Sequence, residues 1–191
     1  MELTIAIIVK NPPKAKEFLE GNKPYLEKYP VVVVDSGGGE DYAAFAKLYE
    51  QKKLNLTDAR KYIVTKIETP FIFILDADVL IPKGYPEQAL ELLRNNKVDA
   101  VSIFYEDLVH CQGALEFGCS IWRTSVLLEL YDFSFNVNDT KKIVQVGPHN
   151  WASLANGWCE CTYMWRKIKD KNLILETLPF RAIHLKGFRA W

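Results

Sequence analysis

The stretch "FIFILDADVLIPKGYPE", residues 71–87, places two carboxylates directly after a run of large apolar residues. Residues 71–75 have the composition of a strand buried on both faces, where water cannot solvate a charge. Asp76 and Asp78 lie two positions apart, so an extended chain directs both side chains to the same side. Two acids on one side repel each other unless a cation binds there. The stretch therefore predicts a buried strand with a cation site at its carboxyl end.

Three other apolar runs, at residues 3–9, 31–35 and 98–104, predict further buried strands. Amphipathic segments lie beside them, and we expect helices at residues 11–21, 41–53, 56–67 and 85–96. Strands that alternate with helices in this way form a mostly parallel central sheet with helices on both faces. The expected class is therefore an α/β fold that is Rossmann-like in its first half.

The helix expected at residues 41–53 rests on the spacing of its apolar side chains. They recur as on one face of a helix, at Tyr42, Phe45, Ala46 and Tyr49. The segment at residues 56–67 follows at once and leads into the strand at residue 71. We expect Thr57 or Asp58 to be its N-cap, because both side chains can accept a hydrogen bond from the first turn.

Beyond residue 105 the alternation of strands and helices becomes less regular. We expect a strand at residues 115–122, a short helix at 124–131, a longer helix at 156–172 and closing strands at 173–180 and 182–187. The polar segment 133–142 is long for a simple connection, so we expect it to contact substrate. No linker, internal repeat or low-complexity stretch interrupts the chain, and we expect one domain over residues 1–191.

The composition limits the partners and the compartment of the protein. The 24 acidic and 24 basic side chains cancel, so we expect no nucleic-acid partner. No apolar stretch has the length of an integral membrane segment, and we expect a cytoplasmic location. Free thiols are favoured in that compartment. An intracellular disulfide remains an alternative if the source is a hyperthermophile. The cysteines concerned are Cys111, Cys119, Cys159 and Cys161.

Three aspartates are expected to meet at one edge of the sheet. Ligands of open α/β sheets bind beyond the carboxyl ends of the strands. Asp35 is the last residue of the strand expected at 31–35, and Asp76 and Asp78 follow the strand expected at 71–75. Mg²⁺ or Mn²⁺ takes one or two carboxylates and completes its shell with water and phosphate oxygens, which indicates a diphosphate ligand. The alternative is that the paired aspartates only cap a helix or start a turn.

The turn "DSGGGED", residues 35–41, is rich in glycine but matches neither the dinucleotide-binding pattern nor the P-loop. Its glycines either let the backbone pass close to a ligand or form a simple flexible turn. Both interpretations stay open from the sequence.

The sequence resembles the nucleotide-sugar glycosyltransferases of the GT-A fold, and most closely their large family 2. The matching motifs are, in order, "IIVKN" at 7–11, "VVVVDSGGGED" at 31–41 and "LTDARKYIVTKIETPFIFILDADV" at 56–79. The resemblance implies transfer of a sugar from a nucleotide-diphosphate sugar to a hydroxyl acceptor, which is a glycan, a protein or a small molecule, with Mn²⁺ or Mg²⁺. It also implies a nucleotide-sugar-binding half at residues 1–105 and an acceptor and catalytic half at 106–191.

The resemblance assigns roles in the first half. Asp35 would bind the nucleobase or ribose, with Asn11 lining the same pocket. Arg60 would reach the nucleotide or its phosphates, although it could also be a solvated helix arginine. Asp76 would lie near the ribose and the metal, and Asp78 would be the direct metal ligand.

The second half matches the family less well. Inverting members carry a glutamate and aspartate pair before a late helix, and the aspartate is the general base. Here the run is "CECTYMWR", so Glu160 aligns with the glutamate and Cys161 replaces the aspartate. Glu160 would then be the base in an inverting reaction, which we favour over a retaining one, or else an exposed helix glutamate. His184 would be a further metal ligand, or else a hydrogen-bonded core residue.

Two other functions compete with glycosyl transfer. A nucleotidyltransferase shares the Rossmann-like sheet and a metal-binding aspartate, but it usually carries a glycine-rich loop after the first strand. The segment "IIVKNPPKAKEF", residues 7–18, contains no glycine. A non-catalytic nucleotide-sugar-binding module is the second alternative, and it is favoured by the cysteine at position 161.

Overall fold

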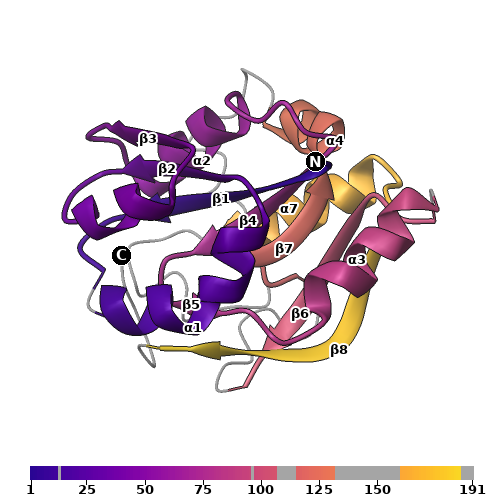
Figure 1. Ribbon diagram of the computed structural model, residues 1–191. Helices are drawn as coiled ribbons and strands as arrows, with labels where there is room; N and C mark the ends of the chain where they lie inside the picture. The colour runs from indigo at the N-terminus through magenta and orange to yellow at the C-terminus, as the bar shows by residue number, and fades with distance from the viewer. Residues whose placement is uncertain (13, 96, 107–114, 132–159, 186–191) are drawn as a thin grey trace.

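The computed structural model describes residues 1–12, 14–95, 97–106, 115–131 and 160–185. One eight-stranded sheet in the order β3-β2-β1-β4-β7-β6-β8-β5 runs through these residues (Figure 1). Its strands are β1 (Leu3–Val9), β2 (Val31–Asp35), β3 (Leu48–Gln51), β4 (Phe71–Asp76), β5 (Val79–Leu80), β6 (Ala100–Tyr105), β7 (Cys119–Arg123) and β8 (Leu175–His184). The helices are α1 (Ala15–Lys28), α2 (Leu56–Val64), α3 (Tyr85–Arg94), α4 (Thr124–Leu130) and α7 (Glu160–Asp170), with a 3₁₀ helix, η1, at Glu40–Phe45.

The strand directions bring the expected aspartates to one edge. β1 pairs in parallel with both β2 and β4, and β3 pairs in parallel with β2. In this register Val9 lies opposite Asp35, and Ile8 lies opposite Asp76. β7 is antiparallel to its neighbours, and β8 returns parallel to β6. Asp35 and Asp76 therefore end adjacent parts of the sheet at its carboxyl edge, as the apolar runs predicted.

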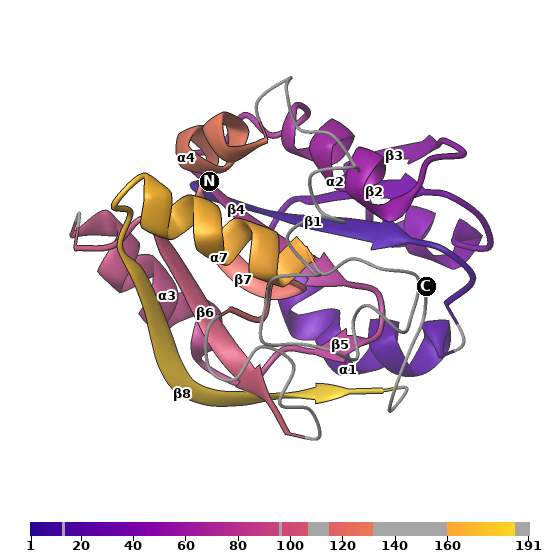
Figure 2. The same cartoon turned by 180° about the vertical axis from the view of Figure 1, so that it is seen from behind.

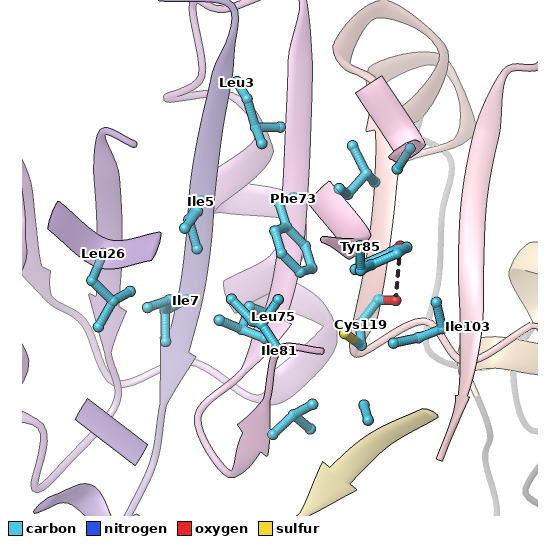
Figure 3. Close-up of a cluster of buried hydrophobic side chains, with 14 of the residues drawn as sticks. Leu3, Ile5, Ile7, Leu26, Phe73, Leu75, Ile81, Tyr85, Ile103 and Cys119 are labelled. Atoms are coloured by element: carbon cyan, nitrogen blue, oxygen red, sulfur yellow. Dashed lines mark hydrogen bonds between the residues drawn. The ribbon is translucent and has the colours of Figure 1, made fainter. Parts of the chain in front are cut away.

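Helices cover both faces of the sheet, as Figures 1 and 2 show from opposite sides. Side chains of α1 and α3 pack on one face, where Phe73 and Tyr85 make an edge-to-face contact (Figure 3). Side chains of α2, α4 and α7 pack on the other face around Trp122. The α/β class, with helices on both faces of the sheet, is thus confirmed. No described helix has the length and apolarity needed to cross a membrane.

The helix expected at residues 41–53 is wrong. This segment forms η1 and then the strand β3, whose backbone pairs with β2. Its apolar side chains do face the core, since Tyr42 is buried and Tyr49 packs against the same cluster. The spacing of the apolar side chains suits a helix equally well, but pairing with β2 stabilises the strand.

The ends of two other helices also differ from expectation. α1 begins at Ala15, beyond the two prolines, and continues through Pro24 to Lys28. The N-cap of α2 is Asn55, whose side chain accepts a hydrogen bond from the backbone N–H of Asp58 at 2.9 Å. Thr57 and Asp58 instead lie inside the first turn.

The second half agrees in its described parts. α4 and α7 lie within the segments expected for them, β7 extends one residue beyond its expected end to Arg123, and one strand, β8, replaces the two closing strands. β8 keeps its pairing with β6 across an irregularity between Ser102 and Phe104. The segment 133–142, expected to contact substrate, lies outside the described residues.

Candidate active site

Asp35 closes β2 and organises the glycine-rich turn that follows it. Its carboxylate accepts hydrogen bonds from the backbone N–H of Gly37 at 2.6 Å and of Gly39 at 3.1 Å. The hydroxyl of Tyr49 in β3 donates a third bond at 2.6 Å. Asp35 is only 2% exposed, so these donors replace the water that would otherwise solvate it. A side chain at Gly39 would collide with this carboxylate, because its Cβ would lie 2.9 Å from the Asp35 Cγ.

Asn11 lies beside the same turn, just beyond the end of β1. Its backbone N–H donates to the Gly37 carbonyl at 2.6 Å, and its φ of 48° is in the left-handed region, which asparagine tolerates. Its side-chain oxygen would lie 3.5 Å from a Cβ at Gly38. The structure therefore brings Asn11 to the turn that Asp35 forms.

Asp76, the last residue of β4, forms an ion pair with Arg60 of α2. The Nη2 atom of Arg60 contacts Oδ1 of Asp76, and the guanidinium lies 5.0 Å from the centre of the Phe117 ring. The Arg60 side chain is 4% exposed and that of Asp76 is 22% exposed. The interpretation of Arg60 as a solvated helix arginine is therefore wrong, because its side chain is buried against Phe117 and paired with Asp76. This ion pair ties α2 to the end of β4.

Asp78 lies beside His184. β5 pairs antiparallel with β8, and the register places Val79 opposite His184. The Nε2 atom of His184 is 3.6 Å from Oδ2 of Asp78, with the two side chains 12% and 9% exposed. The Nδ1 atom of His184 is buried and has no hydrogen-bond partner among the residues that the structure describes. A carboxylate oxygen and an imidazole nitrogen thus lie side by side.

Side chains from distant elements fix the segment that carries Asp78. The amide of Asn22, buried in α1, donates to the Val79 carbonyl at 2.9 Å and accepts from the Ile81 N–H at 2.8 Å. The hydroxyl of Tyr42 donates to the Ala77 carbonyl at 3.0 Å. Backbone groups that would otherwise be unsatisfied are paired in this way, so the segment has a defined course.

A tyrosine accompanies each of the three aspartates. The pairs are Tyr49 with Asp35, Tyr105 with Asp76 and Tyr42 with Asp78. In each pair, burial is the main cause that raises the pKa of the phenol, and the neighbouring carboxylate raises it further. The phenols therefore stay protonated well above neutral pH.

The beginning of α7 lies near the Arg60 and Asp76 ion pair. The backbone N–H of Phe117 donates to Cys161 Sγ at 3.5 Å, and the Phe117 ring packs against Arg60. Glu160 precedes Cys161 as the first residue of α7. The backbone of Glu160 is thus placed on the side of the sheet that carries Arg60, while its side chain lies outside the described residues. Neither Cys119 nor Cys161 forms a disulfide among the residues that the structure describes.

The fold is similar to that of several solved glycosyltransferases. The mannosyltransferase PcManGT from Pyrobaculum calidifontis, in complex with GDP-Man and Mn²⁺, matches with a TM-score of 0.68 at 16% identity, over 100% of this chain and 58% of that one. TarS from S. aureus, in complex with UDP-GlcNAc, matches at 0.63 and 15%, over 100% and 60%. Glucosyl-3-phosphoglycerate synthase from Mycobacterium tuberculosis matches at 0.53 and 12%, over 66% and 58%.

The protein has the GT-A fold of nucleotide-sugar glycosyltransferases. Neither the family models nor the curated proteins compared with the sequence gave a match. The chain spans about three fifths of the length of these structural neighbours. At such low identity the neighbours establish the GT-A fold, and the chemistry has to be argued from the side chains.

The predicted metal ligands divide into two groups in this GT-A fold. Asp78 and His184 lie together, whereas Asp76 is engaged by Arg60. Within the described ranges, no group of three or more His, Cys, Asp or Glu side chains is arranged to hold a metal ion. An oxygen and a nitrogen donor side by side, with the Nδ1 atom of His184 unbonded, nevertheless suit a divalent ion that takes its other ligands from phosphate and water.

Three residues beside the candidate site residues were not singled out from the sequence. Gly118 lies inside an expected strand, and an isolated glycine there indicates close approach of another group. Asn22 gave no such signal, since a polar residue in an amphipathic helix is ordinary. Glu116 is a buried carboxylate that, like Asp76, lies near Cys119. Burial is the main cause that raises the pKa of the Cys119 thiol, and the charges of Asp76 and Glu116 raise it further.

Proposed function

We propose that the protein transfers a sugar from a nucleotide-diphosphate sugar to a hydroxyl acceptor. The observation that carries this proposal is the placement of Asp35, Asp76 and Asp78 at one carboxyl edge of a GT-A sheet, with Arg60 drawn to the same edge. The solved neighbours that bind GDP-Man and UDP-GlcNAc support the same class of donor. The acceptor is a glycan, a protein or a small molecule.

The donor nucleotide would lie between the Asp35 turn and the end of β4. Asp35 and Asn11 would contact the nucleobase or ribose, because both belong to the one turn that projects from β1 and β2. Arg60 would offer its positive charge to the nucleotide phosphates from beside Asp76. Asp76, at the end of β4, would accept a hydrogen bond from a ribose hydroxyl.

Asp78 and His184 would hold a Mn²⁺ or Mg²⁺ ion. Asp76, the third predicted ligand, is paired with Arg60. Such an ion neutralises the negative charge that develops on a nucleoside diphosphate when it leaves. The protein's own contribution is rigidity. Asn22 and Tyr42 hold the segment after β4, so the carboxylate of Asp78 does not have to be ordered when the donor binds.

Glu160 would act as the general base at the beginning of α7. Its carboxylate would take the proton of the acceptor hydroxyl while the hydroxyl oxygen attacks the anomeric carbon, and the bond to the diphosphate breaks on the opposite side. This displacement inverts the configuration at the anomeric carbon. Cys161 occupies the place of the usual acid and, as a thiol, is a poorer acceptor at neutral pH.

The proposal is tested with UDP-, GDP- and dTDP-sugars in the presence of Mn²⁺, by calorimetric binding and by release of nucleoside diphosphate. We expect wild type to bind one nucleotide class in a metal-dependent way. Asp78→Asn should weaken this binding by at least about 100-fold, because it removes a direct metal ligand. Asp170→Asn, a matched change at an exposed acid of α7, should bind as wild type does.

Two outcomes would change the assignment. If wild type binds a nucleotide sugar in a metal-dependent way but shows no turnover with any acceptor tested, the result would favour a non-catalytic binding module, the alternative that the cysteine at position 161 indicates. If no nucleotide sugar binds to wild type at any metal concentration tested, glycosyl transfer is refuted. Turnover that is lost in Glu160→Gln, with donor binding intact, would support the assigned base.

A further inference from the structure

Gly118, directly before β7, contacts the carboxylate of Asp76. Its carbonyl accepts a hydrogen bond from the Asp76 backbone N–H at 2.8 Å. A Cβ atom built on Gly118 would overlap Oδ2 and Cγ of Asp76, far inside the 3.0 Å that real Cβ contacts respect. The same atom would lie 2.9 Å from the hydroxyl oxygen of Tyr105. The absence of a side chain at position 118 thus creates the space that the carboxylate of Asp76 fills.

The other side of this carboxylate is also closed. Oδ1 of Asp76 contacts Arg60, whose guanidinium stacks over Phe117, the residue directly before Gly118. Asp76 is therefore held between Arg60 on one side and the backbone at Gly118 on the other. If it turned away from Gly118 into another rotamer, it would lose the geometry of the ion pair with Arg60.

We propose that Gly118 is a positioning residue of the active site, required because it seats the carboxylate of Asp76. The backbone itself does not demand glycine there. Among the described glycines, only Gly37, Gly38 and Gly84 have positive φ, so the conformation at position 118 is open to alanine. The inference rests on the proposed function, since it gives Gly118 a role through Asp76.

The functional test compares Gly118→Ala with Asp76→Asn. Both variants should lose donor binding or turnover to the same extent, within about threefold of each other, because each removes a correctly placed carboxylate. Asp170→Asn, at an exposed acid of α7, is the control. The control should behave as wild type, and wild-type behaviour of Gly118→Ala would overturn the proposal.

A second measurement stays informative if Gly118→Ala folds poorly. The pair Arg60→Met and Asp76→Ala removes the ion pair without leaving a buried charge. Gly118→Ala should lower the thermal unfolding midpoint in both backgrounds, and the decrease should be several-fold smaller in the double variant than in wild type. The methyl group that Gly118→Ala adds would there occupy the space that the carboxylate of Asp76 has left. Equal shifts in the two backgrounds would show that Gly118 serves the backbone and not Asp76.

The two proposals fail in different ways. If wild type binds no nucleotide sugar, the proposed function is refuted, yet the unfolding comparison still decides whether Gly118 seats Asp76. If wild type binds and turns over donor while Gly118→Ala does the same, only the role of Gly118 is refuted.

Discussion

The aspartates that end β2 and β4 are held in opposite ways. Asp35 receives two of its three hydrogen bonds from backbone N–H groups within four residues, and the third from the neutral Tyr49. Asp76 depends on Arg60, a charged residue of another element, and on the space at Gly118. The first arrangement forms with the local turn, whereas the second exists only when α2, β4 and β7 have packed together.

The difference has an energetic consequence. Several neutral donors share the task of satisfying Asp35, so losing one of them leaves the others in place. At Asp76 an ion pair joins the carboxylate to Arg60, whose side chain is almost fully buried, and removing the carboxylate takes a compensating charge away from the guanidinium. We therefore expect the β4 end to respond to single substitutions more strongly than the β2 end.

The largest effect should come from Asp76→Ala, which leaves Arg60 charged and 4% exposed without its carboxylate. The free energy of unfolding should fall by about 3 kcal/mol, measured by urea denaturation. Adding Arg60→Met should recover most of this loss, because no buried charge then remains. A double variant no more stable than Asp76→Ala would show that the ion pair is not what stabilises this end of the sheet.

Asp35→Asn should have a smaller effect, about 2 kcal/mol by the same measurement. The amide nitrogen of asparagine must face one of the three donors, so one bond is lost while the others persist. Asp41→Asn, an exposed acid of the same turn region, is the matched control and should change stability little. A loss larger than that of Asp76→Ala would reverse the comparison between the two strand ends.

The sequence was sufficient to predict both strand ends but not how they are held. Apolar runs of strand length located Asp35 and Asp76, because burial on both faces leaves a strong compositional pattern. The helix expected at residues 41–53 was wrong because the same apolar residues serve η1 and β3. Once β3 pairs with β2, Tyr49 can reach Asp35, a contact that helical spacing would not allow.

Long-range partners were beyond local patterns. Arg60 and Asp76 are 16 positions apart, and Gly118 comes from a third element, so neither contact follows from any periodicity. Asp78 and His184 meet only because β5 pairs with β8 near the end of the described chain. Their roles as metal ligands, and that of Glu160 as base, remain predictions for the experiments above.

The dependence of stability on alkaline pH gives a third test, which concerns Tyr42 beside Asp78. Burial, with the charge of Asp78, raises the pKa of Tyr42 well above its usual range. The unfolded phenol ionises near pH 10 while the folded phenol does not, so stability is intact below about pH 10 and falls as the pH rises further. One such group removes about 1.4 kcal/mol at pH 11. Urea denaturation at pH 9 and 11 should show a smaller decline in Tyr42→Phe; an unchanged decline would contradict this assignment.

The smallest effect is expected at Tyr49, the one partner of Asp35 that is not part of its own turn. Tyr49→Phe removes a 2.6 Å hydrogen bond but leaves Gly37 and Gly39 donating to the carboxylate, so unfolding should become easier by only about 1 kcal/mol. In the Asp35→Asn background the same change should matter less, since the acceptor is already altered. If Tyr49→Phe were as damaging as Asp76→Ala, the turn could not hold Asp35 by itself. Both strand ends would then depend on packing between distant elements.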